Sequence, residues 1–176
     1  MKVFIGGARQ LHTLNESVIE KLNNILAQNF DILIGDANGI DTSVQKYCHD
    51  HDYKNVTVYA SNGRARNNIG NWEIKNVQVD KNVTGFDFYA AKDFKMAQDA
   101  DCGFMIWNGK SRGTWNNVVN LCRQKKVVVI YVSVQKKIRK FSNIQEAMEF
   151  KEYLENSSTP NIPQDFNLED SQLRLF

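Results

Sequence analysis

The sequence predicts an α/β protein with a doubly wound, mainly parallel sheet, and three observations support this fold class. Short apolar runs of continuous rather than alternating character recur along the chain, as expected for strands that are buried on both faces. Stretches with apolar residues at helical spacing separate these runs. Several runs end in glycine, which marks the turn after a buried strand. Together they indicate a Rossmann-like domain with helices on both faces of the sheet.

The predicted strands and helices alternate along most of the chain. Strands are expected at 3–5, 31–35, 56–59, 102–107 and 127–132. Helices are expected at 41–51, 89–100 and 114–124, with one more before the second strand and one after the last. Thr13 and Glu16 have the spacing of a capping box, which predicts Thr13 as the N-cap of the first helix. Ser142 is the N-cap predicted for the last helix.

The segment 61–88 is rich in Asn, Gly and Asp and is predicted to be a long functional loop with a weak strand. Its residues Arg64 and Arg66 could clamp a phosphate or simply be surface charges. For Trp72, stacking on a base and ordinary packing are equally good interpretations. Trp107 ends a strand at the expected binding edge and could stack on a base, whereas Trp115 is expected to pack in the core.

The composition indicates one domain, at 1–155, followed by a polar tail at 156–176. The formal net charge of +2 argues against a protein that coats nucleic acid. The basic run 136–140 is expected to be a solvated edge. Three scattered cysteines predict no disulfide framework, and Met1 leads directly into a strand rather than a leader. We therefore expect a cytoplasmic protein without a membrane partner, since no apolar stretch approaches a bilayer span.

Three glycine-rich segments that follow predicted strands carry the predicted binding site. Ligands bind beyond the carboxyl ends of parallel strands, where backbone N–H groups and a helix N-terminus can hold a phosphate. The candidates are Gly6, Gly7 and Arg9; Gly35, Asp36, Asn38, Gly39 and Asp41; and Trp107, Asn108, Ser111, Arg112, Gly113, Thr114 and Asn117. They predict a nucleotide or nucleoside phosphate ligand, with no metal and no cofactor. For any one segment, the alternative that its glycines only serve a turn stays open.

The same segments resemble the SLOG superfamily of Rossmann-like domains over about residues 1–132. The segment 35–41 is similar to the Ser-Gly-x-Ala-x-Gly-Ile-Asp segment of DNA-processing protein A. The segment 111–114 is similar to the Gly-x-Gly-Thr turn of the Lonely Guy phosphoribohydrolases and nucleoside deoxyribosyltransferases, and 6–9 occupies the place of their first turn. The resemblance implies a phosphate held by Ser111, Gly113 and Thr114, and it leaves a homo-oligomer open.

One position departs from the enzymes of this superfamily, which carry Gly-Thr-x-x-Glu. Cleavage of an N-glycosidic bond needs a carboxylate, and the glutamate position is Asn117 here. An amide can bind a ribose hydroxyl but supplies no negative charge. The sequence therefore favours a sensor or sequestering module, with no catalytic residue. The alternatives are an N-glycosidic-bond enzyme that uses another carboxylate (Asp36, Asp41, Glu73 or Asp87), and a DNA-associated domain like DNA-processing protein A.

The last five residues, 172–176, resemble the peptide with which bacterial proteins bind the replication sliding clamp. Gln172, Leu173, Leu175 and Phe176 would be its anchors, whereas Arg174 departs from the usual small or acidic residue. The resemblance implies the sliding clamp as a partner. The alternative interpretation is a terminal segment that docks on the protein's own core.

Overall fold

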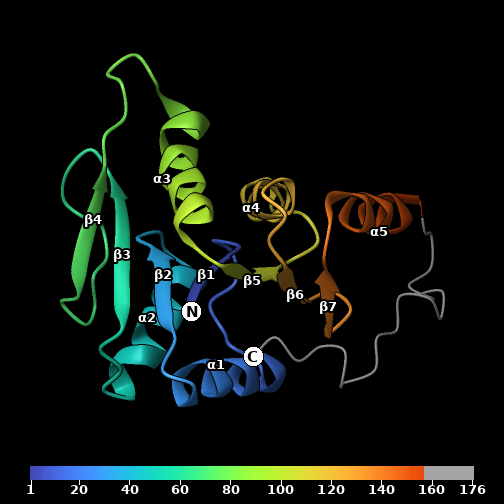
Figure 1. Cartoon of the computed structure of the whole chain (residues 1–176), viewed down its shortest axis with the longest axis horizontal. Coiled ribbons are helices and arrows are strands. Elements are labelled where there is room, and N and C mark those ends of the chain that lie inside the picture. Colours follow the sequence, from blue (N-terminus) through green and yellow to red (C-terminus); the bar gives the residue numbers. More distant parts are fainter. Residues whose placement is uncertain (157–176) are drawn as a thin grey trace.

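The structure is a computed structural model that describes residues 1–156, so the peptide with Gln172, Leu173, Leu175 and Phe176 lies outside the described residues. In the described part, seven strands form one sheet in the order β4-β3-β2-β1-β5-β6-β7 (Figure 1). The strands are β1 (Lys2–Gly7), β2 (Asp31–Gly35), β3 (Val56–Ser61), β4 (Glu73–Val77), β5 (Cys102–Trp107), β6 (Val128–Val132) and β7 (Lys137–Phe141). All neighbours pair in parallel except β6 and β7.

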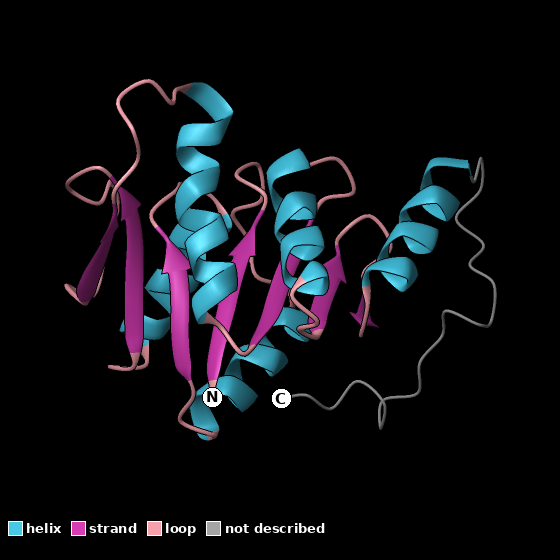
Figure 2. Ribbon diagram, turned by 45° about the horizontal axis from the view of Figure 1, so that its top comes forward, coloured by secondary structure: helices cyan, strands magenta, loops and turns pink. Residues whose placement is uncertain are grey.

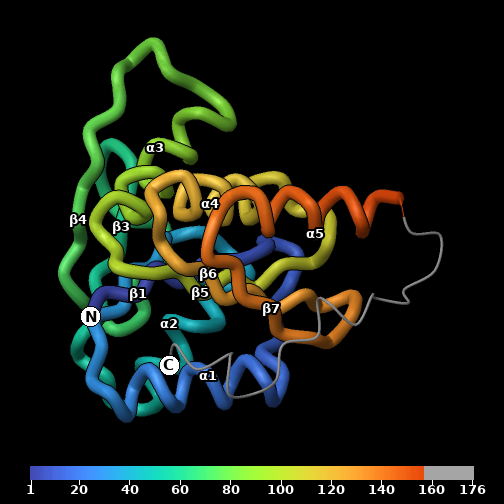
Figure 3. The backbone as a smooth tube through the Cα atoms, turned by 45° about the vertical axis from the view of Figure 1, so that its right-hand side comes forward, coloured from blue at the N-terminus to red at the C-terminus, as the bar shows by residue number. Residues whose placement is uncertain are grey.

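Helices cover both faces of the sheet, which confirms the predicted doubly wound fold (Figures 1 and 2). One face carries α1 (Glu16–Ala27) and α2 (Ile40–Asp50). The other carries α3 (Gly85–Asp99), α4 (Arg112–Arg123) and α5 (Ile144–Asn156). Each face has its own hydrophobic cluster, one built with α1 and α2 and the other with α3, α4 and α5. Figure 3 shows the two layers of helices from a second side.

The strand order reverses between β1 and β5. From β1 the chain adds β2, β3 and β4 outward in one direction, and it then returns to place β5 on the other side of β1. The two strands run in parallel with Gly7 opposite Ile106, so their carboxyl ends lie side by side. Helix α1 leaves β1 toward one face, and α4 leaves β5 toward the other (Figure 1). Ligands of open α/β sheets bind at this kind of reversal.

Two predicted N-caps and the start of α3 differ from the sequence prediction. Asn15, not Thr13, caps α1, because its Oδ1 accepts a hydrogen bond of 3.1 Å from the Val18 amide. Asn143, not Ser142, caps α5 in the same way, with 3.0 Å to the Glu146 amide. Asparagine is as good a cap as serine or threonine, so local spacing did not separate the candidates. Helix α3 begins at residue 85, inside the expected loop 61–88, which also contains β4 as the predicted weak strand.

Trp72 and Trp115 both pack against other residues of the fold. Trp72 donates through Nε1 to the Tyr53 carbonyl at 2.9 Å and packs against the cluster of α1 and α2, which favours the packing interpretation. Trp115 is buried against Trp107 and Phe141, as expected for a core residue.

The three cysteines of the chain all lie in the interior of the fold. All three cysteines are free and buried, and burial raises the pKa of Cys48 to about 12 and that of Cys122 to about 11. Both thiols therefore stay protonated at neutral pH.

Among residues 1–156, no helix has the length and apolar character needed to cross a membrane.

The basic run 136–140 was expected to be solvated, and this is wrong for Arg139. The run forms β7 at the sheet edge, and Arg139 is 4% exposed with its guanidinium over the Phe150 ring. Its Nε and Nη2 have no hydrogen-bond partner among the described residues, and burial lowers its pKa. A buried cation without a carboxylate destabilises the folded state.

We expect Arg139→Leu to raise the free energy of unfolding by about 1–3 kcal/mol, because it removes a buried, unsatisfied charge. Urea denaturation measures the difference. The matched control is Arg123→Leu at an exposed position of α4, which should change stability little. A loss of stability in Arg139→Leu larger than in the control would contradict the prediction.

Candidate functional site

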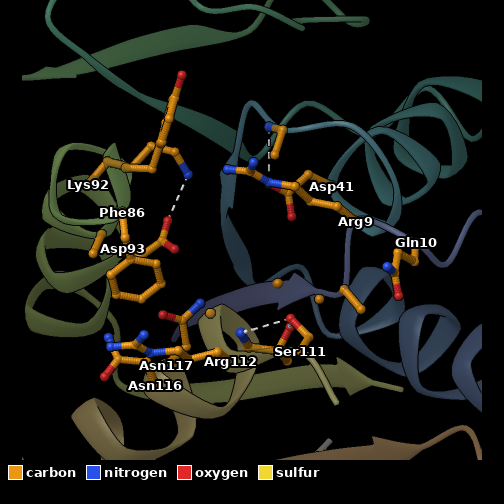
Figure 4. A pocket seen from close by; sticks show the side chains of 18 of the residues that line it. Arg9, Gln10, Asp41, Phe86, Lys92, Asp93, Ser111, Arg112, Asn116 and Asn117 are labelled. Carbon is orange, nitrogen blue, oxygen red and sulfur yellow. Dashed lines mark hydrogen bonds and ion pairs between the residues drawn. The ribbon is translucent and has the colours of Figure 1, made fainter. Parts of the chain in front are cut away.

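A cleft of about 630 Å³ opens at the carboxyl ends of β1 and β5, where the strand order reverses (Figure 4). Its walls come from the loop after β1, the start of α2, one side of α3, and the loop between β5 and α4. The predicted site residues that line it are Gly6, Gly7, Arg9, Asp41, Asn108, Ser111, Arg112, Gly113, Thr114 and Asn117. The structure thus brings all three predicted segments to one cleft.

The first turn of α4 is held rigidly at the cleft. Asn108 Oδ1 accepts hydrogen bonds from the amides of Lys110 at 3.0 Å and Ser111 at 2.7 Å. Ser111 caps the helix, with its Oγ 3.3 Å from the Thr114 amide and 3.0 Å from the Thr114 hydroxyl. Since the first amides of a helix have no intrahelical partner, those of Arg112 and Gly113 are donors for a ligand.

Gly113 gives a ligand access to this turn. A Cβ at this position would meet no atom within 4 Å, and the backbone there has no positive φ. The glycine therefore serves neither a turn nor close packing. Its bare Cα leaves the helix N-terminus open toward the cleft, which is what an anion needs in order to approach the amides.

Three cations line the cleft without an ion pair to any of residues 1–156: Arg9, Lys110 and Arg112. The guanidinium of Arg9 lies 5.1 Å from the centre of the Tyr89 ring, and that of Arg112 lies 4.9 Å from the centre of the Phe86 ring. The positive charges of these residues are therefore available to a ligand. The contacts with Tyr89 and Phe86 already position the guanidinium groups of Arg9 and Arg112.

Five predicted site residues are not part of the lining, and three of them shape the loops instead. A Cβ at Gly35 would overlap Asp41 Oδ2 and lie 2.7 Å from Lys92 Nζ, so the glycine makes room for buried charges. Gly39 has a φ of +86°, and a Cβ there would overlap the Arg9 backbone. Trp107 is 3% exposed, and its Nε1 donates to the Ser111 carbonyl at 3.0 Å. A base therefore cannot stack on Trp107 in this arrangement.

The other two residues outside the lining, Asp36 and Asn38, hold the segment 62–72. Arg66 donates to Asp36 through Nε at 3.0 Å and Nη2 at 2.6 Å. Asn67 donates to the Asn38 side chain at 3.0 Å. Burial opposes ionisation of Asp36, but the hydrogen bonds from Arg66 and the charge of Lys92 outweigh it and lower its pKa. Arg66 is thus an ion-pair partner, and Arg64 is not part of the cleft lining.

Helix α3 supplies the wall that the sequence analysis missed. Phe86, Tyr89, Lys92 and Asp93 line the cleft, yet the first of them fell inside the expected loop 61–88. The spacing of Phe86, Tyr89 and Asp93, by three and four residues, is typical of one helix face and was the available signal. The sequence carried no indication that this face would meet the cleft, because that depends on how α3 crosses the sheet.

Lys92 lies at the centre of a buried charge cluster. It is 3% exposed, and its Nζ lies 2.7 Å from Asp93 Oδ1 and 3.8 Å from Asp36 Oδ1. Burial disfavours the ammonium ion, but the negative charges of Asp93, Asp41 and Asp36 more than compensate, and the pKa of Lys92 is raised. The lysine therefore stays protonated and ties α3 to the end of β2.

Asp41 is the most strongly perturbed carboxyl group of the cleft. Its Oδ2 accepts from the Ala37 amide at 3.2 Å, and burial raises its pKa to about 7 despite the nearby charge of Lys92. Of the carboxylates considered as substitutes for a catalytic glutamate, Asp36, Glu73 and Asp87 lie outside the lining, and only Asp41 belongs to it.

Asn117 lines the cleft where the resemblance places a glutamate. Its side chain is buried, and Oδ1 has no hydrogen-bond partner among the described residues. The same part of the chain contains no group of three or more His, Cys, Asp or Glu that could hold a metal ion.

No protein-family model and no curated protein matches this chain. The likeness to the SLOG superfamily stays a prediction that depends on the three strand-end segments.

The pKa of Asp41 predicts a pH dependence of stability. Its folded value of about 7 lies above the ordinary 3.8, so between these values the folded state keeps a proton that the unfolded state has lost. Stability should therefore fall as the pH rises from about 4 to 7 and level off above, and Asp41→Asn should remove this part of the slope. Melting temperatures at pH 5 and pH 8 measure it.

The control for this pH dependence is Asp52→Asn, at an exposed carboxyl group outside the cleft. It should leave the pH profile unchanged. If Asp41→Asn and the control give the same difference between pH 5 and pH 8, the assignment of the slope to Asp41 is wrong.

Proposed function

We propose that this protein binds a nucleotide or a nucleotide-derived small molecule in the cleft and acts as a sensor or sequestering module for it. The observation that carries the proposal is the open N-terminus of α4, where the amides of Arg112 and Gly113 meet a cleft with three cations that have no ion-pair partner within residues 1–156. Anions are stabilised at helix N-termini, and guanidinium groups strengthen the binding of phosphate.

The remaining wall of the cleft suits the apolar part of such a ligand. Phe4, Phe86, Tyr89, Ala90 and Met96 line it on the side of α3 and β1. Phe86 and Tyr89 are partly exposed, so a base could contact their rings. The volume of about 630 Å³ lies within the range of small-molecule sites. A nucleotide carries an anionic phosphate at one end and a largely apolar base at the other, so a phosphate site beside an apolar wall suits it.

Cleavage of an N-glycosidic bond is the second candidate, because two carboxylates, Asp41 and Asp93, line the same cleft. Asn117 in place of the expected glutamate supports binding without catalysis, since an amide cannot stabilise an oxocarbenium-like charge. Incubation with nucleoside monophosphates and chromatography of the products distinguishes the two. Accumulation of free base would favour the enzyme.

Gly113→Val should weaken nucleotide binding and leave the fold intact. The isopropyl group would occupy the space in front of the α4 amides, and its Cβ meets no atom of a neighbouring element within 4 Å. Ala27→Val, at an exposed position of α1, is the matched control for adding a β-branched side chain to a helix. Thermal shift with a panel of nucleoside monophosphates measures binding through mass action.

The expected result is a nucleotide-dependent rise in melting temperature for the wild type and Ala27→Val, and an affinity at least about tenfold weaker for Gly113→Val. Absence of any shift in the wild type would overturn the proposed function. Equal binding by Gly113→Val would show that the phosphate does not lie at α4.

A further inference from the structure

We propose that the cleft selects ribonucleotides over deoxyribonucleotides, with Asn117 of α4 and Asp93 of α3 holding the two hydroxyls of the ribose. This inference rests on the proposed nucleotide-binding function and goes beyond it, because it names the sugar. Neither residue is needed to bind a phosphate or a base.

Asn117 carries a buried hydrogen-bonding group that the described part of the chain does not satisfy. The residue is 5% exposed, and its Oδ1 has no partner among residues 1–156. Its side chain points from α4 into the cleft (Figure 4). Buried polar groups in folded proteins are nearly always paired, so an unpaired one in a cleft wall indicates a partner that arrives with the ligand.

Asp93 lines the same cleft from the neighbouring helix, α3. Its side chain extends into the cleft in Figure 4, and α3 and α4 pack against each other. Lys92 Nζ contacts Oδ1 at 2.7 Å, which fixes the carboxylate, and Oδ2 accepts no hydrogen bond within residues 1–156. A carboxylate oriented in this way is a good acceptor for a sugar hydroxyl.

The distance along α4 fits a sugar linked to the phosphate. Asn117 follows Gly113 by four residues, which places it about 6 Å farther along the helix axis, on nearly the same side. A sugar whose 5′ phosphate sits on the first-turn amides would lie against this second turn. Gly6 borders the same place, where a Cβ would lie 3.2 Å from Phe4 Cε2 and 3.7 Å from both Asn117 Nδ2 and Met105 Sδ, so this glycine lets Asn117 pack closely against β1.

Hydroxyl chemistry matches both side chains. A hydroxyl donates one hydrogen bond and accepts others, so it can pair with either half of the Asn117 amide, whereas the Asp93 carboxylate only accepts. A ribose diol supplies one hydroxyl to each residue. A 2′-deoxyribose leaves one of them unpaired, and a 2′,3′-dideoxyribose leaves both, which costs affinity because a buried polar group stays unsatisfied.

The experiment measures affinities by calorimetry for the 5′-monophosphates of adenosine, guanosine, cytidine and uridine, and for their 2′-deoxy and 2′,3′-dideoxy counterparts. The protein is the full chain, with Asn117→Leu as the variant and Ala27→Val as the control. Changing the ligand leaves the wild-type fold untouched, so the ligand series stays informative even if a variant does not fold. Asn117→Leu removes the amide and keeps a similar volume.

We expect the best ribonucleotide to bind wild type and Ala27→Val about tenfold or more tightly than its dideoxy counterpart, with the deoxy form between them. Asn117→Leu should reduce this ratio severalfold. Equal affinities across a sugar series, or a ratio unchanged in Asn117→Leu, would overturn the inference while leaving the proposed function in place. If none of the nucleotides binds, the proposed function fails and the inference fails with it.

Discussion

The candidate site depends on one constraint, which is that the chain leaves two neighbouring parallel strands toward opposite faces of the sheet. β1 and β5 end side by side, yet the chain leaves them toward opposite faces of the sheet, into α1 and α4 (Figure 1). No helix can cover both strand ends, so a gap opens between them. Every backbone group of the proposed phosphate site borders this gap. The reversal of strand order therefore creates the site before any particular side chain contributes to it.

A buried electrostatic cluster then sets the third wall. Lys92 brings α3 to the end of β2 through Asp36, and Gly35 is the residue whose missing side chain makes room for it. A buried lysine is costly unless carboxylates surround it, so the position of α3 is strongly specified. This placement also turns Phe86, Tyr89 and Asp93 toward the cleft. The lysine that holds the helix through Asp36 also orients Asp93, one of the groups expected to meet the ligand.

The sequence predicted the parts of the site that obey local rules. Glycine-rich segments after buried strands are recognisable because parallel strands place their carboxyl ends at one edge, and this was enough to locate Arg9, Ser111 and Gly113. It could not separate glycines that face a ligand from glycines that face the protein. Gly35 and Gly39 look like phosphate-loop residues in the sequence, but each accommodates a tertiary contact with Asp41, Lys92 or Arg9. The helix at 89–100 was predicted, but its place in the cleft wall was missed for a similar reason, since that place depends on a buried ion pair between distant segments.

The charges that line the cleft favour the binding of a nucleotide anion over the cleavage of its N-glycosidic bond. A glutamate in place of Asn117 would set a second carboxylate opposite Asp93 and would oppose a phosphate at α4. With asparagine, the carboxylates that remain are Asp93, neutralised by Lys92, and Asp41, whose raised pKa of about 7 makes it partly protonated at neutral pH. Arg9, Lys110 and Arg112 keep their positive charge uncompensated by any carboxylate of residues 1–156. The electrostatic balance of the cleft is therefore positive where the phosphate would lie and weakly negative where the sugar would lie. This distribution would stabilise a bound nucleotide in its ground state, and it provides no concentrated negative charge for bond cleavage.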